Sequence, residues 1–512
     1  METGDILVID LFAGPGGLGE GVSSVKTQLG AYPFKIGVSV ERESSAHKTL
    51  TTRAFYRKIR SNKNALADYN SYLSKSIDRA ELMRRHPKLA KEALLETLGK
   101  PRALGEDNHI IHNRIRKVIR RHTGPKVVIG GPPCQAYSLA GRSRNAGIEN
   151  YRAEEDHRNF LYLEYLQVLA IAQPEVFVME NVKGILSAKV NDNPMFPQIL
   201  KDLREPSAVT NIPCEGYRIY SLVTPAENVH VPEYKNPSDY LIRSEEYGVP
   251  QARHRVILLG VRNDINSVPR TLQPHTEEVT VKQVLSDLPM LRSGFSKRKD
   301  TAVDWQRIVS KNGEKLHKIL PRLFPEAYDS QLVLQPIHNL KRKESVKMPH
   351  HGKSLPNHLR DWFLTNPPPC VLNHETRGHM ESDLLRYAFS ASYTALSGGV
   401  SPKSKDFPKE LAPSHENWDT GSHADRFRTQ AANKCSTTVT SHISKDGHYF
   451  IHYDPKQCRS LTVREAARLQ TFPDNYIFEG TRTQQYVQVG NAVPPYLAQQ
   501  IGQVVLELLN GN

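Results

Sequence analysis

The sequence predicts an α/β protein built on a doubly wound sheet, with a second, smaller domain that is poor in regular structure. Strand-like and helix-like stretches alternate through the first third of the chain, glycine-rich turns follow two of the strands, and the periodicity decays after about Val268. Such alternation is typical of a parallel sheet covered by helices. At 512 residues the chain is about twice the size at which a single core stops growing, so we expect at least two domains.

The composition indicates a globular protein with a polyanionic partner. The chain has 68 Lys and Arg against 54 Asp and Glu, a formal net charge of +14 and a pI near 9.3, which favours nucleic acid as a partner. Its five cysteines are scattered and include no CxxC pair, which favours neither a disulfide framework nor a zinc ribbon. No apolar run approaches the roughly 18 residues of a membrane span, and no basic segment precedes the first apolar stretch. We therefore expect a cytoplasmic protein.

The first two strands and the turn between them predict a ligand site. The run Ile6–Ile9 ends at Asp10, the turn Gly14–Gly17 leads into an amphipathic stretch, and a second run, Ile36–Val40, ends at Glu41. Glycines let the backbone approach a ligand, and the N-terminus of the following helix favours a carboxylate or phosphate. Glu41 could accept hydrogen bonds from ribose hydroxyls, so this order of elements suits a nucleotide-like ligand.

The stretch from Thr51 to His122 is charged and helix-prone, with RAFYRKIR, ELMRRHPKLAKEALLETL and HNRIRKVIRR as candidate amphipathic helices. We interpret it as a solvated helical insertion. A basic face that touches phosphates is the alternative interpretation.

A cysteine and a carboxylate are expected at the same edge of the sheet. The strand Val127–Ile129 is followed by GGPPCQAYS, in which two prolines and two glycines would hold the thiol of Cys134 on a stiff turn. The later strand Val176–Met179 runs directly into Glu180. Open α/β sheets keep their ligands at the carboxyl ends of their strands, where burial would favour the protonated form of this carboxylate.

Two arginines precede the last strong strand. Arg253 and Arg255 follow the segment YGVPQA and lead into the strand Val256–Gly260. Two guanidinium groups at the start of a strand suit an anionic or carbonyl-rich ligand, although surface arginines at this position would look the same.

Between Val268 and Cys458 prolines, histidines and lysines dominate, and we expect irregular loops. The spacings of the possible metal ligands there match no zinc pattern, so we assign no metal. These residues are His374, His379, His423, Cys435, His442 and His448.

Six segments, in this order, resemble the DNA (cytosine-5)-methyltransferases of the prokaryotic modification-enzyme type. They are DLFAGPGGLGEG (10–21), GGPPCQAYS (130–138), FVMENVKGIL (177–186), YGVPQARHRV (247–256), RSLTVREAARLQTFPD (459–474) and QVGNAVPP (488–495). The match spans nearly the whole chain, and the unmatched region falls where that family has its variable target-recognition domain. Ala136 and Tyr137 replace the usual Gly-Phe, and the charged stretch before His122 is longer than typical.

The resemblance implies the Rossmann-like fold of S-adenosylmethionine-dependent methyltransferases, in which a mostly parallel, doubly wound sheet with one antiparallel strand faces a smaller, irregular target-recognition domain across a DNA cleft. It assigns residues 1–267 to a catalytic domain with the insertion at about 51–122, residues 268–475 to the recognition domain, and residues 476–512 to a segment that returns to the catalytic domain. Leu461, Ala466 and Leu469 are spaced to give one apolar helical face, which we expect to support the recognition domain.

The resemblance also implies which residues carry the chemistry. The thiolate of Cys134 would add to C6 of cytosine, while Glu180, kept protonated by burial, and Arg255 would stabilise charge at N3 and O2, with Arg253 as a further catalytic residue. The residues expected to bind S-adenosylmethionine are Asp10, Phe12, Ala13, Gly14, Gly16, Gly17, Leu18, Glu41, Asp107, Pro132, Asn491, Ala492 and Val493. Those expected to bind the substrate are Gln135, Ser138, Asn181, Thr438 and Thr440.

The expected partner is duplex DNA, with the target base flipped out of the stack and the phosphates held by a basic second domain. We expect a monomer; a separately acting restriction endonuclease or phage-defence partner stays open, as does the recognition sequence. One alternative is an RNA cytosine-5 methyltransferase of the same fold, which generally lacks so large a variable domain. Another is a catalytically silent DNA-binding homologue, which would be expected to lose Cys134 or Glu180, and both are present.

Overall fold

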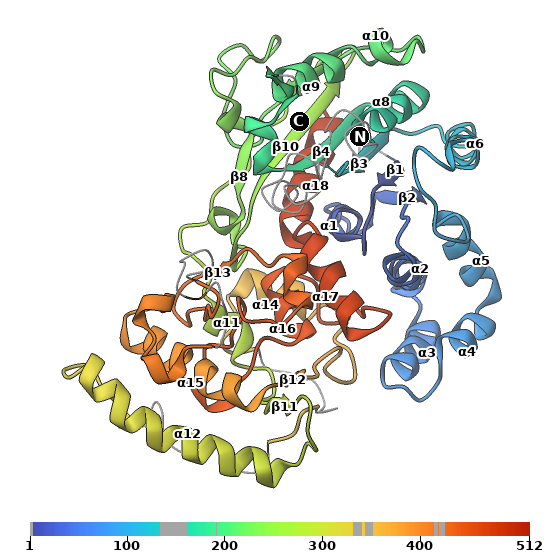
Figure 1. The fold of residues 1–512 in the computed structure, drawn as a ribbon. Helices are drawn as coiled ribbons and strands as arrows, with labels where there is room; N and C mark the ends of the chain where they lie inside the picture. The colour runs from blue at the N-terminus through green and yellow to red at the C-terminus, as the bar shows by residue number, and fades with distance from the viewer. Residues whose placement is uncertain are drawn as a thin grey trace.

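The computed structural model describes residues 4–133, 161–190, 192–330, 340–343, 352–413, 418 and 425–511. A seven-stranded sheet forms the upper part of the molecule in Figure 1, and α11 to α17 lie below it. The strands follow the order β2 (Phe34–Ser39), β1 (Ile6–Leu11), β3 (Lys126–Gly130), β4 (Val176–Val182), β10 (His254–Arg262) and β7 (Tyr217–Tyr220), and β8 (Leu241–Arg243) pairs with β10.

Strand directions confirm the predicted doubly wound, mostly parallel sheet. β1 is parallel to β2 and β3, and β3 is parallel to β4. β10 is antiparallel to β4, β7 and β8. The start of β10 therefore lies beside the end of β4, and Arg255 pairs in register with Val182.

Helices cover both faces of the sheet, so its central strands are buried on both sides. On one face α1 (Gly17–Ser24) and α18 (Pro495–Leu509) share an apolar core with β1, β3 and β4. On the other face α6 (Asn108–Ile119), α8 (Leu161–Ala172) and α9 (Met195–Arg204) pack in a second core. Among the described helices, none combines the length and apolar character needed to cross a membrane.

The stretch from Thr51 to His122 is helical, as predicted, but not all of its charge is solvated. The helices before α6 form a column beside both the sheet and the lower part (Figure 1). Buried Arg53 pairs with Glu20 of α1 at 2.5 Å, and its guanidinium lies over the rings of Tyr56 and Tyr476. These contacts join the column to α1, the first helix of the sheet domain, and to the C-terminal region. Its helices are α2 (Ser44–Ile59), α3 (Lys63–Leu73), α4 (Arg79–Arg85) and α5 (Pro87–Glu96).

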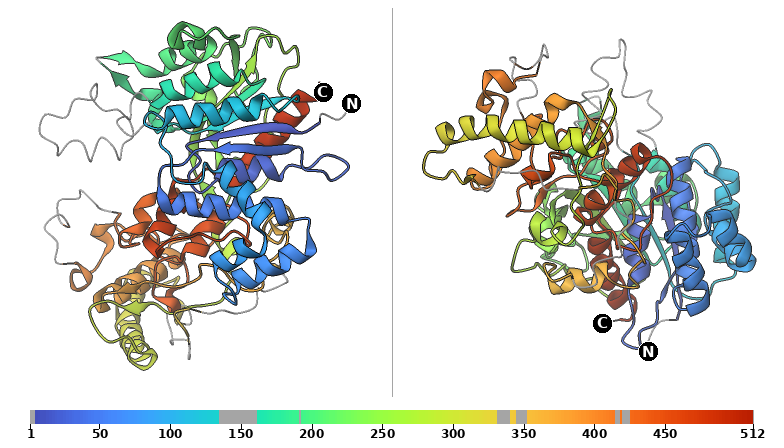
Figure 2. Two further views of the ribbon diagram at one scale, coloured as in Figure 1. Left: turned by 90° about the vertical axis from the view of Figure 1, so that its right-hand side faces the viewer. Right: turned by 90° about the horizontal axis from the view of Figure 1, so that it is seen from below.

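The lower part consists largely of loops around two apolar cores, and its described strands are two residues long. Its longest helix, α12 (Ala302–Leu323), was not predicted; α12 packs on α15 and forms the outer edge of the molecule (Figure 2). The remaining helices here are α11 (Val281–Leu285), α14 (Asn357–Phe363), α15 (Glu381–Leu396), α16 (Val463–Leu469) and α17 (Arg482–Asn491). The short strands are β9 (Gln251–Ala252), which pairs with β13 (Ser436–Thr437), and β11 (Gly294–Phe295), which pairs with β12 (Gly378–His379).

Between β4 and β10 the chain also forms α10 (Pro206–Thr210) and the hairpin of β5 (Lys189–Val190) and β6 (Asn193–Pro194). Along the whole chain, the 3-10 helices that the structure describes are η3 (Lys183–Ser187), η4 (Pro237–Tyr240), η5 (Ser244–Tyr247), η6 (Ser404–Asp406), η7 (Lys409–Leu411), η8 (Ser441–Ser444) and η9 (Pro455–Gln457).

Buried arginines hold the loops of the lower part around α16. Leu461, Ala466 and Leu469 lie in one apolar core. Arg464 donates to the carbonyls of Leu372, Pro473 and Tyr476. Arg459 pairs with Glu465, and Arg468 pairs with Asp474 and Asp287. A guanidinium can donate five hydrogen bonds, so one side chain holds several loop segments at once.

The first and last helices pack at close range. A Cβ built on Gly21 of α1 would lie 2.2 Å from the Pro495 carbonyl oxygen of α18, so a side chain larger than that of glycine does not fit there. This contact brings the C-terminus back beside the N-terminus (Figure 2). Judged by which core each residue packs in, the C-terminal segment rejoins the sheet core at Val493. Tyr486 and Val489 of α17 still belong to a core of the lower part.

We expect Gly21→Ala to lower the free energy of unfolding by about 1–3 kcal/mol, because its methyl group forces α1 and α18 apart. Urea unfolding followed by circular dichroism measures the change. Gly4→Ala is the control, since a Cβ there meets nothing within 4 Å. Equal stability of the two variants would contradict the tight α1–α18 contact.

Candidate active site

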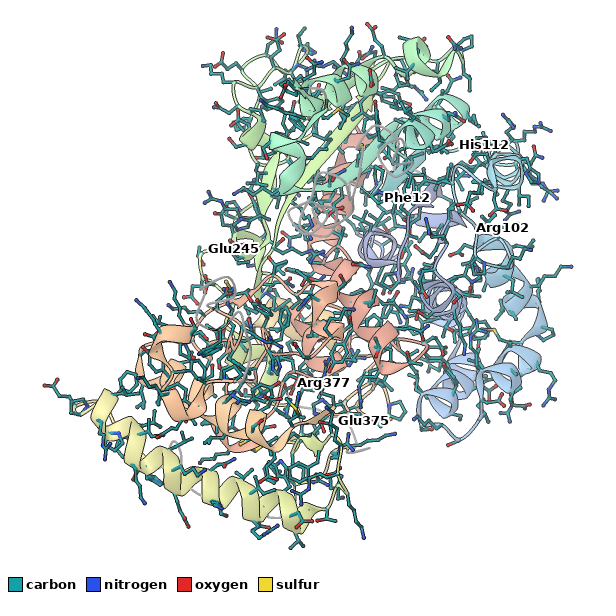
Figure 3. The ribbon with its side chains drawn as sticks, viewed as in Figure 1. Phe12, Arg102, His112, Glu245, Glu375 and Arg377 are labelled. Carbon is teal, nitrogen blue, oxygen red and sulfur yellow. The ribbon has the colours of Figure 1, made fainter. Side chains whose placement is uncertain are left out.

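A cavity of about 600 Å³ lies where the carboxyl ends of the parallel strands meet the lower part of the molecule. This edge of a doubly wound sheet is the usual place for a ligand. Figure 3 labels Phe12 in the upper right part of the molecule and Arg102 to its right, from two of the segments that form the walls. The lining comes from several segments: Phe12, Gly14 and Pro15 after β1; Val40–Glu43 and Ala46 after β2; Arg102–Leu104; Gly131 and Pro133 after β3; Leu161; Glu180 and Val182 of β4; Arg253 and Arg255; Thr440 and Ser441; and residues 487, 488, 490 and 491.

The loop after β1 has an unusual backbone conformation. Phe12 has φ 53°, Gly14 has φ 58° and Gly16 has φ 98°. The N–H of Gly14 donates to Glu41 Oε2 at 2.7 Å, and the other oxygen of Glu41 accepts from the N–H of Glu43. Burial raises the pKa of Glu41. The loop and the end of β2 therefore form one hydrogen-bonded wall of the cavity.

Asp10 lies behind this wall rather than in it. Neither of its carboxylate oxygens has a hydrogen-bond partner among the described residues, and the side chain is buried. Burial raises its pKa to about 8.

Glu180 and Arg255 form an ion pair in the cavity, with 2.8 Å between Arg255 Nε and Glu180 Oε1. Each side chain is only 13% exposed. The antiparallel pairing of β10 with β4 brings them together. Burial lowers the pKa of Arg255, and the carboxylate of Glu180 opposes that shift. The structure therefore brings the two side chains into contact, and the protonated form of Glu180 stays a prediction.

Arg253 lines the cavity but is held by backbone carbonyls. Its guanidinium donates to the carbonyl of Val439 at 2.9 Å and to that of Gly490 at 3.2 Å. Burial lowers its pKa well below the ordinary value. Arg253 thus joins the start of β10 to two segments of the lower part, which suits a positioning residue.

A buried amide pair reinforces this junction. Gln251 donates to Gln470 Oε1 at 2.6 Å and accepts from the N–H of Val439 at 2.7 Å. Gln470 in turn donates to the carbonyls of Val489 and Ala492. The sequence analysis singled out neither glutamine.

The turn that precedes Cys134 enters the cavity. Gly131 and Pro133 line it, and a Cβ on Gly131 would lie 2.7 Å from Glu180 Oε2. Asn181 Nδ2 donates to the carbonyl of Pro132 at 3.3 Å, which ties the turn to β4. Cys134, Gln135 and Ser138 themselves lie outside the described residues.

The cavity gathers only part of the predicted set. Phe12, Gly14, Glu41, Glu180, Arg253, Arg255, Thr440 and Asn491 line it. Asp10, Ala13, Gly16, Gly17, Leu18, Asp107, Pro132, Asn181, Thr438, Ala492 and Val493 lie outside its lining.

Several of the outlying residues support the walls. Asp107 accepts from Arg102 Nη1 at 2.8 Å and from the N–H of Ala103. Thr438 donates to the carbonyl of Ala252. Gly17 packs against the backbone of Val493.

Some of the lining residues were not predicted from the sequence. Arg42 and Glu43 directly follow Glu41, which was a usable signal. The sequence carries no such signal for Arg102. A hydrogen bond from its backbone N–H to the carbonyl of Glu41 places it beside the cavity, and any residue type with an N–H could make this bond.

The histidines considered as metal ligands serve other purposes where the structure describes them. His374 is hydrogen-bonded to Thr462 and to the carbonyl of Pro289. His379 and His448 both contact the hydroxyl of Tyr387. Within the described ranges, no three His, Cys, Asp or Glu side chains are grouped so as to hold a metal ion.

Comparison with known proteins identifies close relatives of this chain. The model of the C-5 cytosine-specific DNA methylase family matches residues 105–507. The type II methyltransferase M.Bpa9945I of Bacillus paralicheniformis is 33% identical, over 99% of this chain and 100% of its own length. The DNA (cytosine-5-)-methyltransferase M.ApeKI of Aeropyrum pernix is 26% identical, over 75% of this chain and 81% of its own. The crystal structure of a putative DNA modification methyltransferase from an E. coli prophage aligns with a TM-score of 0.49 at 18% identity, covering 99% of this chain and 100% of the other.

Arg253→Lys tests the junction at this cavity. Lysine has no planar fork to reach two carbonyls, so we expect the free energy of unfolding to fall by about 1–3 kcal/mol. Urea unfolding gives the value. Arg243→Lys, whose side chain is 58% exposed, is the control and should change little. An Arg253→Lys protein as stable as that control would show that the two carbonyl bonds contribute nothing.

Proposed function

The chain belongs to the C-5 cytosine-specific DNA methylase family, and on that premise we propose that it methylates C5 of cytosine within a specific duplex DNA sequence, with S-adenosylmethionine as the methyl donor. It is a DNA (cytosine-5-)-methyltransferase. The observation that carries the finer proposal is the Glu180–Arg255 pair, which shares one cavity with the loop after β1, Glu41 and the turn that leads to Cys134. The names of its relatives support a role in a type II restriction-modification system.

The cavity fits the needs of cytosine activation. C5 of cytosine is a poor nucleophile, so a thiolate must first add to C6, forming a C–S bond and moving electrons toward N3 and O2. We assign that addition to Cys134, and the entry of Gly131 and Pro133 into the cavity supports this assignment. C5 would then bond to the methyl carbon while the sulfonium S–C bond breaks and leaves its electron pair on sulfur, and removal of the C5 proton by a base would let the Cys134 thiolate leave C6.

Glu180 and Arg255 are suited to the charge that develops on the ring. A protonated Glu180 would donate to N3 and the guanidinium of Arg255 would donate to O2, both within a largely buried site where hydrogen bonds are stronger than in water. The two groups contact each other at 2.8 Å. When the base enters, each group would have to give up part of this contact and bond to the base instead. Arg253 would act by holding the walls, because its donors already bind carbonyls.

The loop after β1 and Glu41 fit an adenosine-containing cofactor. Gly14 adopts positive φ and lines the cavity, and the half-buried carboxylate of Glu41 is available to ribose hydroxyls. Asn491 from the last turn of α17 completes this wall, while Asp107 would act through Arg102. When bound, S-adenosylmethionine supplies an electrophilic sulfonium methyl group.

The lower part of the molecule is the proposed recognition domain, within residues 268–475. Leu272 packs in the core of the sheet and Val279 in a core of the lower part, so the chain passes from one core to the other between these residues. Thr440 lines the cavity from this side, which supports its predicted contact with a flipped base. The net charge of +14 supports binding to the phosphates of duplex DNA.

Bisulfite sequencing of DNA from cells that express the chain tests the proposal. We expect 5-methylcytosine in one sequence context, with no methylation of tRNA by the purified protein. Methyl transfer to tRNA alone would favour the RNA methyltransferase instead, and methylation of neither would favour a silent DNA-binding homologue.

Cys134→Ser should reduce methyl transfer to duplex DNA below detection while cofactor binding persists, because the hydroxyl cannot replace the thiolate in addition to C6. Transfer of labelled methyl groups measures the activity. Cys214→Ser, at a free cysteine outside the cavity, should retain it. Turnover by Cys134→Ser would remove this residue from the mechanism.

Glu41→Ala should weaken S-adenosylmethionine binding about 10-fold or more, because the ribose loses a charged acceptor in a buried position. Isothermal titration calorimetry gives the affinity. The exposed Glu106→Ala is the matched control. An affinity equal to that of the control would rule out Glu41 as the ribose ligand.

A further inference from the structure

A second cavity, of about 680 Å³, lies in the lower part of the molecule and shares no lining residue with the first. Figure 3 shows Glu375, which lines it, well below Phe12 of the first cavity. The helix α17 contacts both: Arg482 and Gln485 of its first turns line the second cavity, and Asn491 at its end lines the first.

Three distant parts of the chain build this second cavity. The C-terminal end of α3 contributes Lys75, and the thiol of Cys370 contacts the carbonyl of Leu73 at 3.6 Å. The backbone of Lys343 is fixed by a β-bridge to Glu375. The cavity is therefore held by contacts between the helical column and the lower part.

Positive charge predominates in its lining. Lys75, Lys343 and Arg482 face it, and Glu375 is the single carboxylate among the described lining residues. Glu375 is shared, at 3.8 Å from Lys343 and 3.5 Å from Arg482. The ammonium group of Lys343 lowers the pKa of Lys75, which reflects two like charges brought close together. An anion between the two lysines would relieve that repulsion.

The rest of the lining combines an apolar wall with the polar residues Ser74, Asn373, His374 and Gln485. Val371, Leu372, Val463 and Ile477 contribute side chains to the wall. A cavity of this size with an apolar wall and a few convergent charges suits a small organic molecule rather than a bare ion.

We propose that this second cavity binds the phosphate of a nucleotide, with Lys75 and Lys343 as its cationic ligands and the apolar wall against the sugar or base. Lysine binds phosphate as a point charge through three donors, and two lysines at one place neutralise a phosphate dianion. The nucleotide is either free or part of a DNA strand, and both sources present the same group. The site takes no part in the methyl-transfer chemistry proposed above.

Calorimetric titration of the full chain with inorganic phosphate and with uridine monophosphate, without cofactor or DNA, tests the proposal. We expect uridine monophosphate to bind more tightly than phosphate, and the Lys75→Gln/Lys343→Gln double variant to bind both at least tenfold more weakly. Lys311→Gln/Lys318→Gln, on the exposed face of α12, should match the unmodified chain. Lys75→Arg/Lys343→Arg should retain binding, which separates lost charge from misfolding.

A parallel titration with a duplex of about 20 base pairs distinguishes the sources. If the Gln double variant weakens only duplex binding, the phosphate belongs to DNA; if it weakens only nucleotide binding, the ligand is a free nucleotide. Unchanged affinity of the Gln double variant for all three probes overturns the proposal. Methyl transfer is measured separately, so the failure of this site and the failure of the proposed function give different results.

Discussion

The reversed direction of β10 is the constraint on which the rest of the site depends. Because β10 runs antiparallel to β4, its first residues meet the last residues of β4, and Arg255 reaches Glu180. The segment just before β10 carries Gln251 and Arg253, whose side chains hold Val439 and Gly490. A parallel β10 would send this segment to the opposite edge of the sheet. One strand direction thus places the ion pair and also anchors the lower part of the molecule beside it.

The lower part replaces sheet hydrogen bonds with buried side-chain donors. Its described strands are two residues long, so most of its buried carbonyls need other partners. Arg464 and Arg468 are fully buried, and they donate to loop carbonyls and to Asp474 and Asp287. Each guanidinium is costly to desolvate, and the cost is offset only because nearly every donor finds an acceptor.

Both ends of the chain are needed to complete the cavity. The loop after β1 forms one wall, and Asn491, which precedes α18, forms another. The two are held together by the close packing of α1 on α18. The helical column adds a third connection, since Arg53 joins Glu20 of α1 to the ring of Tyr476. The cavity is therefore a product of long-range packing rather than of any single segment.

The sequence by itself determined the doubly wound sheet and the loop after β1, because strand periodicity and strand-end residues are local signals with a known spatial meaning. The contact of Glu180 with Arg255 depends on the reversed direction of β10, which the residues alone do not give. The roles of Cys134 and Glu41 rest on motifs of the sequence and stay predictions. It missed the 22-residue helix α12, although the buried Trp305, Ile308, Val309, Leu316 and Leu320 have helical spacing, and it treated the charge of Arg53 as solvated. Only the tertiary structure decided that Arg253 binds carbonyls, that Arg102 joins the cavity and that Lys75 faces Lys343. These outcomes depend on which distant acceptor or charge each side chain meets, and no local pattern in a single sequence records that.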